Sequence, residues 1–165
     1  MTGPTAPLPE PLSPEEEALA ADFRFQHSVA LFNSGEWYAC HDGFEELWHE
    51  TLGESRPALQ GILQIAVAHL HLERGNLRGA TVLLGEGLGR LRRYGTSHLG
   101  LDLDALRRCA QARLAALQQG QTVEALPLPR LRAADGAPIR WPEATIREPD
   151  WPQHAGPQPA APEPG

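Results

Sequence analysis

Apolar residues recur at helical spacing through the middle of the chain, and clusters of Pro, Gly, Ser and Asn separate the apolar stretches. A capping-box sequence over 13–16 predicts a first helix from 14 to about 33. A second helix follows, which carries His41 and Glu45 and ends near Gly53. Two consecutive helices joined by a short turn are therefore expected in this region.

The third expected helix runs from Pro57 to about Arg74 and is apolar on nearly all sides, which predicts that it lies at the centre of the fold. Gly75 and Asn76 combine a C-cap with an N-cap, so a fourth helix turns back in an antiparallel hairpin. The fourth and fifth helices are expected over about 77–94 and from Asp102 or Asp104 to Gly120. No segment alternates with the period of a strand. The sequence predicts an all-α, single-domain bundle of about five helices.

Proline is frequent towards both ends of the sequence and scarce in the middle. Proline-rich segments favour extended or disordered chain. We therefore expect a helical domain over 14–120, with a proline-rich N-terminal extension over 1–13 and a proline-rich C-terminal tail over 121–165. We attach no function to the tail.

The 165 residues carry a net charge of −7, and all 14 basic residues are Arg. The lack of Lys excludes Schiff-base chemistry and a lysine general base. Nucleic-acid binding needs a clustered positive field, so the acidic balance argues against nucleic acid as a partner. Arg90, Arg92 and Arg93 are best explained as the solvated last turn of a helix, where cations complement the helix dipole.

Cys40 and Cys109 are too few and too far apart for a disulfide framework or a CxxC zinc site, so we expect buried thiols. The sequence shows neither a signal-peptide pattern nor an apolar run of membrane-spanning length. We therefore expect a soluble, cytoplasmic protein that does not use a membrane as a partner.

The second expected helix places ionisable side chains beside the residues that it must bury. At about 100° per residue, His41 falls near the middle of an apolar stripe and Glu45 on its flank. A charged pair half-buried in a core must be hydrogen-bonded, paired or metal-bound, because an unpartnered one costs several kcal/mol. The other side chains of interest are Trp37 and Trp48, which lie on the same stripe, and Asp42, Glu46 and Glu50, which point the other way.

The third expected helix carries a narrow polar stripe formed by Gln60, Gln64 and His71. A polar stripe on a buried helix needs a partner. If it lies opposite the ionisable pair of the second helix, the two form a polar pocket roofed by the two tryptophans, which could hold a small ligand. His69 lies off this stripe, and we assign it no role.

Three ordered motifs occur between about residues 22 and 94. They are Leu31-Phe32-Asn33-x-Gly35-x-Trp37-Tyr38-x-x-His41-Asp42-x-x-Glu45-x-x-Trp48, then Arg56 with Leu59-Gln60-Gly61, and finally Arg74-Gly75-Asn76-x-x-Gly79-Ala80. Together they resemble domain-of-unknown-function family 309 of prokaryotes. The resemblance implies a small all-α domain without a settled biochemical activity.

Position by position, the family's hallmark HE-x-x-E-x-x-W falls on His41, Asp42, Glu45 and Trp48, and its second motif falls on Gln60 and Gly61. Asp42 departs from the pattern, since the family more often has Glu there, and this shortens the reach of the carboxylate by one methylene. The candidate ligand-binding residues are Trp37, Asp42, Trp48, Arg56, Gln60, Gln64 and His71.

Three interpretations of the pair stay open. In the first, Glu45 is a base or orienting group and His41 an acid or base in hydrolase-type chemistry. In the second, the i, i+4 spacing lets His41 and Glu45 bind one divalent metal ion, although the amides of the third helix are poor ligands for transition metals. In the third, Glu45 accepts a hydrogen bond from His41 or Arg56, and the polar cluster with Gln60 and Gln64 only locks two helices together.

The third interpretation makes the protein a non-catalytic helical module. Its exposed grooves would bind a protein partner or a second copy of the chain. An apolar patch on the surface of the fourth or fifth expected helix would favour this alternative.

Overall fold

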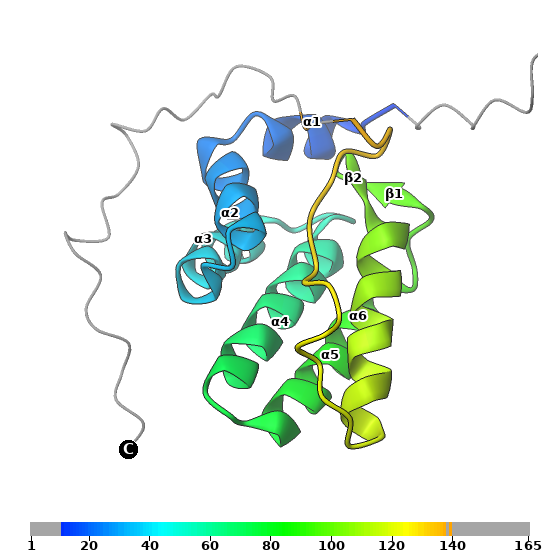
Figure 1. Cartoon of the computed structure of the whole chain (residues 1–165). Coiled ribbons are helices and arrows are strands. Elements are labelled where there is room, and N and C mark those ends of the chain that lie inside the picture. The colour runs from blue at the N-terminus through cyan, green and yellow to red at the C-terminus, as the bar shows by residue number, and fades with distance from the viewer. Residues whose placement is uncertain (1–10, 138, 140–165) are drawn as a thin grey trace, which may run out of the picture.

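The computed structural model describes residues 11–137 and 139, and within them the chain forms six helices and one short pair of strands. The helices are α1 (Pro14–Ala20), α2 (Phe23–Asn33), α3 (Trp37–Glu50), α4 (Arg56–Glu73), α5 (Leu77–Leu91) and α6 (Leu103–Gln118), and the strands are β1 (Ser97–His98) and β2 (Leu101–Asp102). Helix α4 lies between the α2–α3 pair and the α5–α6 pair (Figure 1). The all-α class predicted from the sequence is confirmed.

The first expected helix is in fact two helices, α1 and α2. Asp22 interrupts it as the N-cap of α2, where its backbone is extended and its side chain accepts a hydrogen bond from the backbone N–H of Arg24 at 2.8 Å. Asp is among the preferred N-cap residues, so a single side chain breaks an otherwise helical pattern. The capping box at the start of α1 is confirmed, since Ser13 and Glu16 each accept a hydrogen bond from the backbone N–H of the other.

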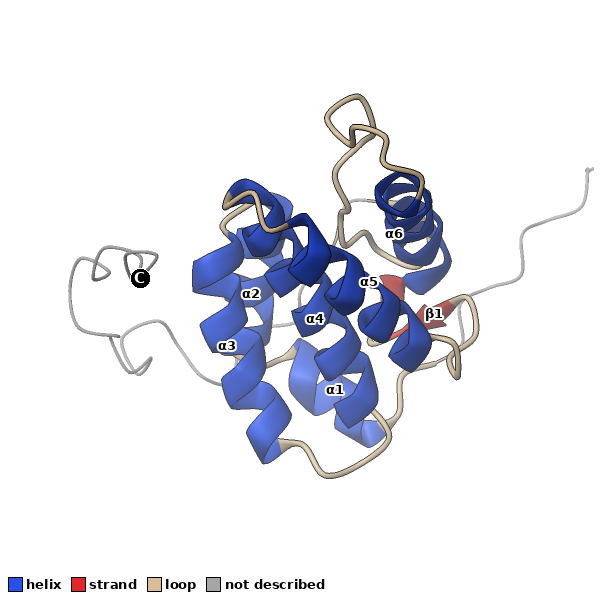
Figure 2. Ribbon diagram, turned by 90° about the horizontal axis from the view of Figure 1, so that it is seen from below, coloured by secondary structure: helices blue, strands red, loops and turns tan. Residues whose placement is uncertain are grey.

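Helix α4 is the central helix, and Figure 2 shows it between α3 and α5. Its residues Ile62 and Ile65 are completely buried. Two glycines allow α4 and α5 to approach closely. A Cβ added to Gly87 would lie 2.9 Å from the carbonyl oxygen of Gly61, and a Cβ added to Gly61 would lie 3.0 Å from the carbonyl oxygen of Gly87. The two backbones therefore touch where no side chain would fit.

The short antiparallel hairpin of β1 and β2 connects α5 to α6 and was not predicted. Its turn residues Leu99 and Gly100 have φ angles of 57° and 72°. Gly adopts this left-handed region freely, whereas Leu rarely does, and strands of two residues are too short to show alternation. Asp102 then begins α6 as its N-cap, as expected, because its side chain accepts a hydrogen bond from the backbone N–H of Ala105 at 2.9 Å.

Residues 121–137, which we call the strap, run from the end of α6 back along the bundle to the β hairpin (Figure 1). Leu131 of the strap is only 1% exposed, and Ala133 forms an isolated antiparallel bridge with Leu101. Packed structure therefore continues past residue 120, where the sequence suggested that the helical domain ends.

The prolines of 1–10 and 140–165, on which the expectation of extended or disordered ends partly rested, lie outside the described residues. Among the helices that are described, none combines the length and the apolar character needed to cross a membrane.

Candidate functional site

The His41–Glu45 pair lies on the surface of α3. Nε2 of His41 is 2.9 Å from Oε2 of Glu45, and the two side chains are 31% and 42% exposed. Oε1 of the same carboxylate is 3.6 Å from Nε2 of His49, and Nδ1 of His41 is 3.4 Å from Oδ1 of Asp42. The four side chains form one connected row, and all of them belong to a single helix.

The buried face of α3 is rotated away from His41. Cys40 and Phe44 are completely buried on this face. Gly43 extends the buried face towards α2, since a Cβ there would lie 2.0 Å from the hydroxyl oxygen of Ser28. The prediction that His41 lies near the middle of the apolar stripe is therefore wrong, because it did not allow for a second helix packing on the side of Gly43.

The polar stripe of α4 is directed towards α5. Nε2 of Gln64 donates to Oε2 of Glu86 at 3.0 Å, and Oε1 of Gln64 accepts from Nε of Arg90 at 2.9 Å. Nδ1 of His71 lies 3.0 Å from Nδ2 of Asn76, in the connection to α5. Within the described residues these two side chains of α4 do not join the pair on α3, so the arrangement differs from the expected pocket.

Arg56 and Trp48 contact one another where α3 ends and α4 begins. Cζ of Arg56 lies 4.2 Å from the centre of the Trp48 ring, and Nε donates to the carbonyl oxygen of Trp48 at 3.3 Å. Stacking of this kind contributes about 0.5–1 kcal/mol at exposed sites. Of the two partners that the sequence left open for Glu45, the structure shows His41. Gln60, one turn after Arg56, is half-buried.

Trp37 is part of the core and is 4% exposed. Its ring lies edge-on to Phe32, with 5.1 Å between the ring centres, and 4.9 Å from the ring of His69. The indole therefore packs between α2 and α4, at a distance along α3 from the end that holds Trp48. The two tryptophans do not form a common roof.

His69, for which the sequence indicated no role, is the histidine with the most perturbed environment described. It is 2% exposed, and its Nδ1 lies 2.7 Å from the carbonyl oxygen of Ile65, which makes Nδ1–H the donor. Nε2 has no hydrogen-bond partner within the described residues. Burial lowers the pKa of His69 to about 4, and the positive charge of Arg113 acts in the same direction. The sequence signal that could have indicated its burial is its position one turn after Ile65 in a helix that is apolar on nearly all sides.

Arg24 on α2 was also missed, although it joins three carboxylates. It is 8% exposed and pairs with Asp22 at 2.8 Å, with Glu46 at 3.2 Å and with Glu50 at 2.5 Å. The hydrogen bond from Arg24 lowers the pKa of Glu50, and the bonds to Glu50 and Asp22 raise the pKa of Arg24. The expectation that Glu46 and Glu50 point away from the fold is wrong, because α2 covers that side of α3.

Neither thiol has the environment of a nucleophile. Burial raises the pKa of Cys40 to about 12, and it also raises the pKa of Cys109. In the part of the chain that the structure describes, no group of three or more His, Cys, Asp or Glu side chains is arranged to hold a metal ion.

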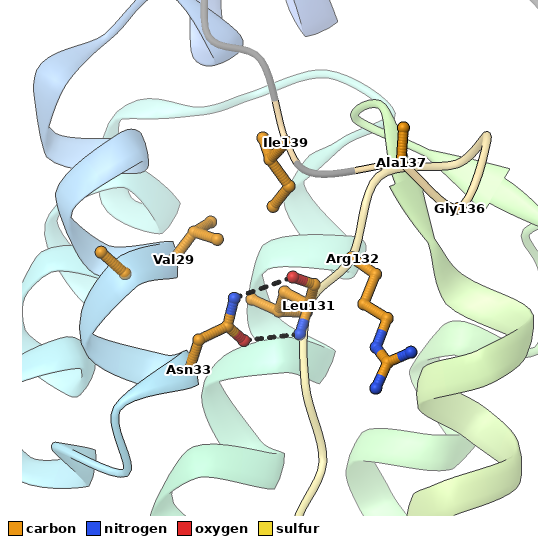
Figure 3. Close-up of a pocket in the computed structure, with 8 residues that line it drawn as sticks. Val29, Asn33, Leu131, Arg132, Gly136, Ala137 and Ile139 are labelled. Atoms are coloured by element: carbon orange, nitrogen blue, oxygen red, sulfur yellow. Dashed lines mark hydrogen bonds between the residues drawn. The ribbon is translucent and has the colours of Figure 1, made fainter.

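A cavity of about 430 Å³ opens between α2 and the strap, away from the candidate site. Figure 3 shows the side chains of Val29 and Ile139 beside it, with the guanidinium of Arg132 directed away from Ile139. The amide of Asn33 holds the strap there. Nδ2 donates to the carbonyl oxygen of Leu131 at 2.8 Å, and Oδ1 accepts from the backbone N–H of the same residue at 2.7 Å. Because Val29, Leu131 and Ile139 line this cavity, its walls are mainly apolar.

A smaller cavity of about 180 Å³ lies between α5 and α6, and it is lined by Leu88, Arg92, Arg107, Arg108 and Gln111. Neither cavity is lined by any of the candidate site residues.

The described helices make this a small all-α domain. Residues 25–83, from α2 into α5, match the family model described as Domain of unknown function (DUF309). Over this segment the match confirms the resemblance drawn from the motifs. A comparison with curated proteins finds no match.

Proposed function

We propose that the protein is a non-catalytic helical module that binds a protein partner, and that polar side chains at its helix interfaces hold its helices together. The position of Gln64 is the observation that carries this proposal. Its amide bonds to Glu86 at one end and to Arg90 at the other, both on α5. Gln64 therefore joins α4 to α5 and is not directed at the His41–Glu45 pair.

Neighbouring helices are connected by polar contacts of this kind throughout the motif region. The contacts are Arg24 to Glu50 between α2 and α3, Arg56 to Trp48 between α3 and α4, and Gln64 to Arg90 between α4 and α5. Hydrogen-bonded groups at helix interfaces restrict how the helices pack, because each group is left unpaired in other arrangements. These contacts need no substrate.

Apolar exposure on α5 supports the binding part of the proposal. Leu77 is 57% exposed and Val82 is 53% exposed. An apolar patch on the fourth or fifth expected helix is the feature that favours an interaction module over a catalytic domain, and these two side chains are the large apolar residues that α5 exposes. Helix α5 is an outer helix of the bundle and offers this surface to a partner.

A small-ligand site with hydrolase-type chemistry, or a divalent metal site, is the second candidate. The 2.9 Å contact between His41 and Glu45 and its partial exposure favour it, because both groups can be reached from solution. The engagement of Gln64 with α5 weighs against it, because this amide is not available to a ligand held by the pair.

Thermal melts with divalent metals separate the two candidates. Wild type, His41→Ala and Glu45→Gln are melted with Zn²⁺, Mn²⁺ and Mg²⁺, with His27→Ala on α2 as a histidine control. The proposal predicts that no metal raises the melting temperature of wild type more than that of His41→Ala. A rise that is retained in His27→Ala and lost in both pair variants would overturn the proposal in favour of a ligand site.

A positive test uses a photo-crosslinking amino acid at position 82 of α5 or position 41 of α3, in the cells that make the protein. The proposal predicts a cross-linked protein from position 82 that, once purified, forms a saturable complex with the full chain. Complex formation that maps to position 41 alone would contradict the proposed surface.

A further inference from the structure

The groove between α5 and α6 has room for about one side chain. The two helices lie side by side (Figure 1). A cavity of about 180 Å³ opens between them. Leu88, which is 4% exposed, is the most buried of its lining residues, and Arg92 follows one turn later as the C-cap of α5. Sites for whole small molecules usually measure about 300–1,000 Å³, so this volume suits a single inserted side chain.

The surface of α5 next to the cavity is unobstructed at Gly85. Gly85 lies one turn before Leu88, and a Cβ added there would meet nothing within 4 Å. On the opposite side Gln111 and Ala112 of α6 are exposed. A peptide segment can therefore lie along the groove while one of its side chains enters the cavity.

Arg107 is fixed at one end of the groove by neutral groups. Its Nη1 donates to the carbonyl oxygens of Leu91 at 2.9 Å and Tyr94 at 3.2 Å, and its Nη2 donates to that of Gly95 at 2.7 Å. These carbonyls orient the guanidinium, but they carry no net charge with which to neutralise it.

The rim of the groove has more positive than negative charge. Nε of Arg108 is 3.6 Å from Oδ2 of Asp104, and both side chains are largely exposed. Arg92 is exposed, and it takes part in no ion pair with the described residues. The guanidinium groups of Arg92, Arg107 and Arg108 line the groove, and the carboxylate of Asp104 pairs with one of them. This local excess of positive charge occurs on a chain whose net charge is −7.

We propose that this groove binds an acidic segment of a partner protein, with carboxylates on Arg92 and Arg108 and an apolar side chain on Leu88. The inference rests on the proposed function and names its partner class. Arg binds carboxylates through paired N–H donors, and its aliphatic stem supplies an apolar wall. The cavity beside Leu88 gives an aliphatic side chain of the partner an apolar contact.

Fluorescence anisotropy with the full chain tests the inference. The probe is a short labelled peptide of glutamates with two leucines at its centre. Two comparison peptides replace the leucines by serine or the glutamates by glutamine. We expect saturable binding of the probe that weakens from low to physiological salt and is lost with either comparison peptide.

The positive charge of the rim is tested with a double variant that carries both Arg92→Gln and Arg108→Gln. Arg78→Gln, at the other end of α5, is the matched control. We expect the double variant to bind the probe at least about tenfold more weakly, and the control to stay within about twofold. Circular dichroism melts of the variants check that the fold is retained.

Equal losses in the double variant and in Arg78→Gln would overturn the inference, because they would show a general charge effect. It is likewise overturned if the serine peptide binds as well as the probe, or if oligothymidylate or inorganic phosphate displaces the probe at lower concentration than unlabelled peptide does. If the peptide does not bind but cross-linking at position 82 is retained, this inference alone is overturned. A His41-dependent metal site overturns the proposed function instead.

Discussion

Arg24 of α2 and Glu50 of α3 form a two-point ion pair, with 2.8 Å between Nη1 and Oε1 and 2.5 Å between Nη2 and Oε2. The guanidinium is nearly buried, whereas the carboxylate side chain is 55% exposed. The pair therefore lies at the edge of the core and determines how α2 is placed on α3. Asp22 and Glu46 depend on the same guanidinium.

Replacing Arg24 by Met should destabilise the domain, because the aliphatic stem is kept while three carboxylates lose their common cation. We expect the free energy of unfolding to fall by about 2–4 kcal/mol, somewhat less than for a fully buried pair. Urea unfolding measures this difference. Arg78→Met, at an exposed position of α5, should change stability by no more than about 0.5 kcal/mol. Equal losses in the two variants would refute the role given to Arg24.

Alanine at two glycines of α5 should have opposite effects. Gly87→Ala places a methyl group 2.9 Å from the carbonyl oxygen of Gly61, so we expect a loss of about 1–3 kcal/mol. Gly85→Ala meets nothing within 4 Å and should stabilise the helix by about 0.5–1 kcal/mol. Thermal melts of both variants provide the measurement. If Gly87→Ala is tolerated as well as Gly85→Ala, α4 and α5 do not approach as closely as described.

Burial of His69 should make stability depend on pH in the acid range. Its pKa is lowered from 6.5 to about 4 in the folded state, so the unfolded chain binds more protons between these values. Stability is therefore fully present above pH 6.5 and falls as the pH drops towards 4. Relative to His69→Asn, wild type should lose roughly 3 kcal/mol between about pH 7 and pH 4. Urea unfolding of both proteins across this range measures it, and a difference that does not change with pH would show that His69 is not buried as a neutral group.

Asn33→Ala should loosen the strap without unfolding the bundle. It removes both hydrogen bonds between the side-chain amide and the backbone of Leu131, each contributing about 0.5–1.5 kcal/mol. We expect the amide hydrogen of Leu131 to exchange with solvent at least about tenfold faster. Asn76→Ala, which removes the N-cap of α5, serves as a control that should leave exchange at Leu131 unchanged. Unchanged exchange in Asn33→Ala would mean that other contacts hold the strap.

Local signals predicted most of the helices. The capping box at Ser13, the Gly75–Asn76 turn and the N-cap at Asp102 mark real helix boundaries, because capping depends on residues a few positions apart. The break at Asp22 also has a local signal, the N-cap preference of Asp, but nothing in the apolar pattern shows which Asp interrupts a helix. The hairpin through Leu99 is too short for periodicity to detect.

Side-chain partners across helices were harder to predict. A helical wheel gives the direction of each side chain, but it does not say how many helices surround the wheel. Two helices, α2 and α4, pack against α3. This packing leaves His41 partly exposed and places Glu50 beside Arg24. For α4 the polar stripe was found, yet the sequence could not choose between α3 and α5 as the partner of Gln64.

The stability of Gln64→Ala and His41→Ala, compared by urea unfolding, is the most informative single measurement on the polar contacts between helices. If they hold helices together, Gln64→Ala loses about 1–2 kcal/mol, because Glu86 and Arg90 lose their shared partner across the α4–α5 interface. His41→Ala loses no more than about 0.5 kcal/mol, since its partner Glu45 lies on the same helix and both are partly exposed. A loss of several kcal/mol in His41→Ala, with Gln64→Ala unchanged, would contradict this interpretation.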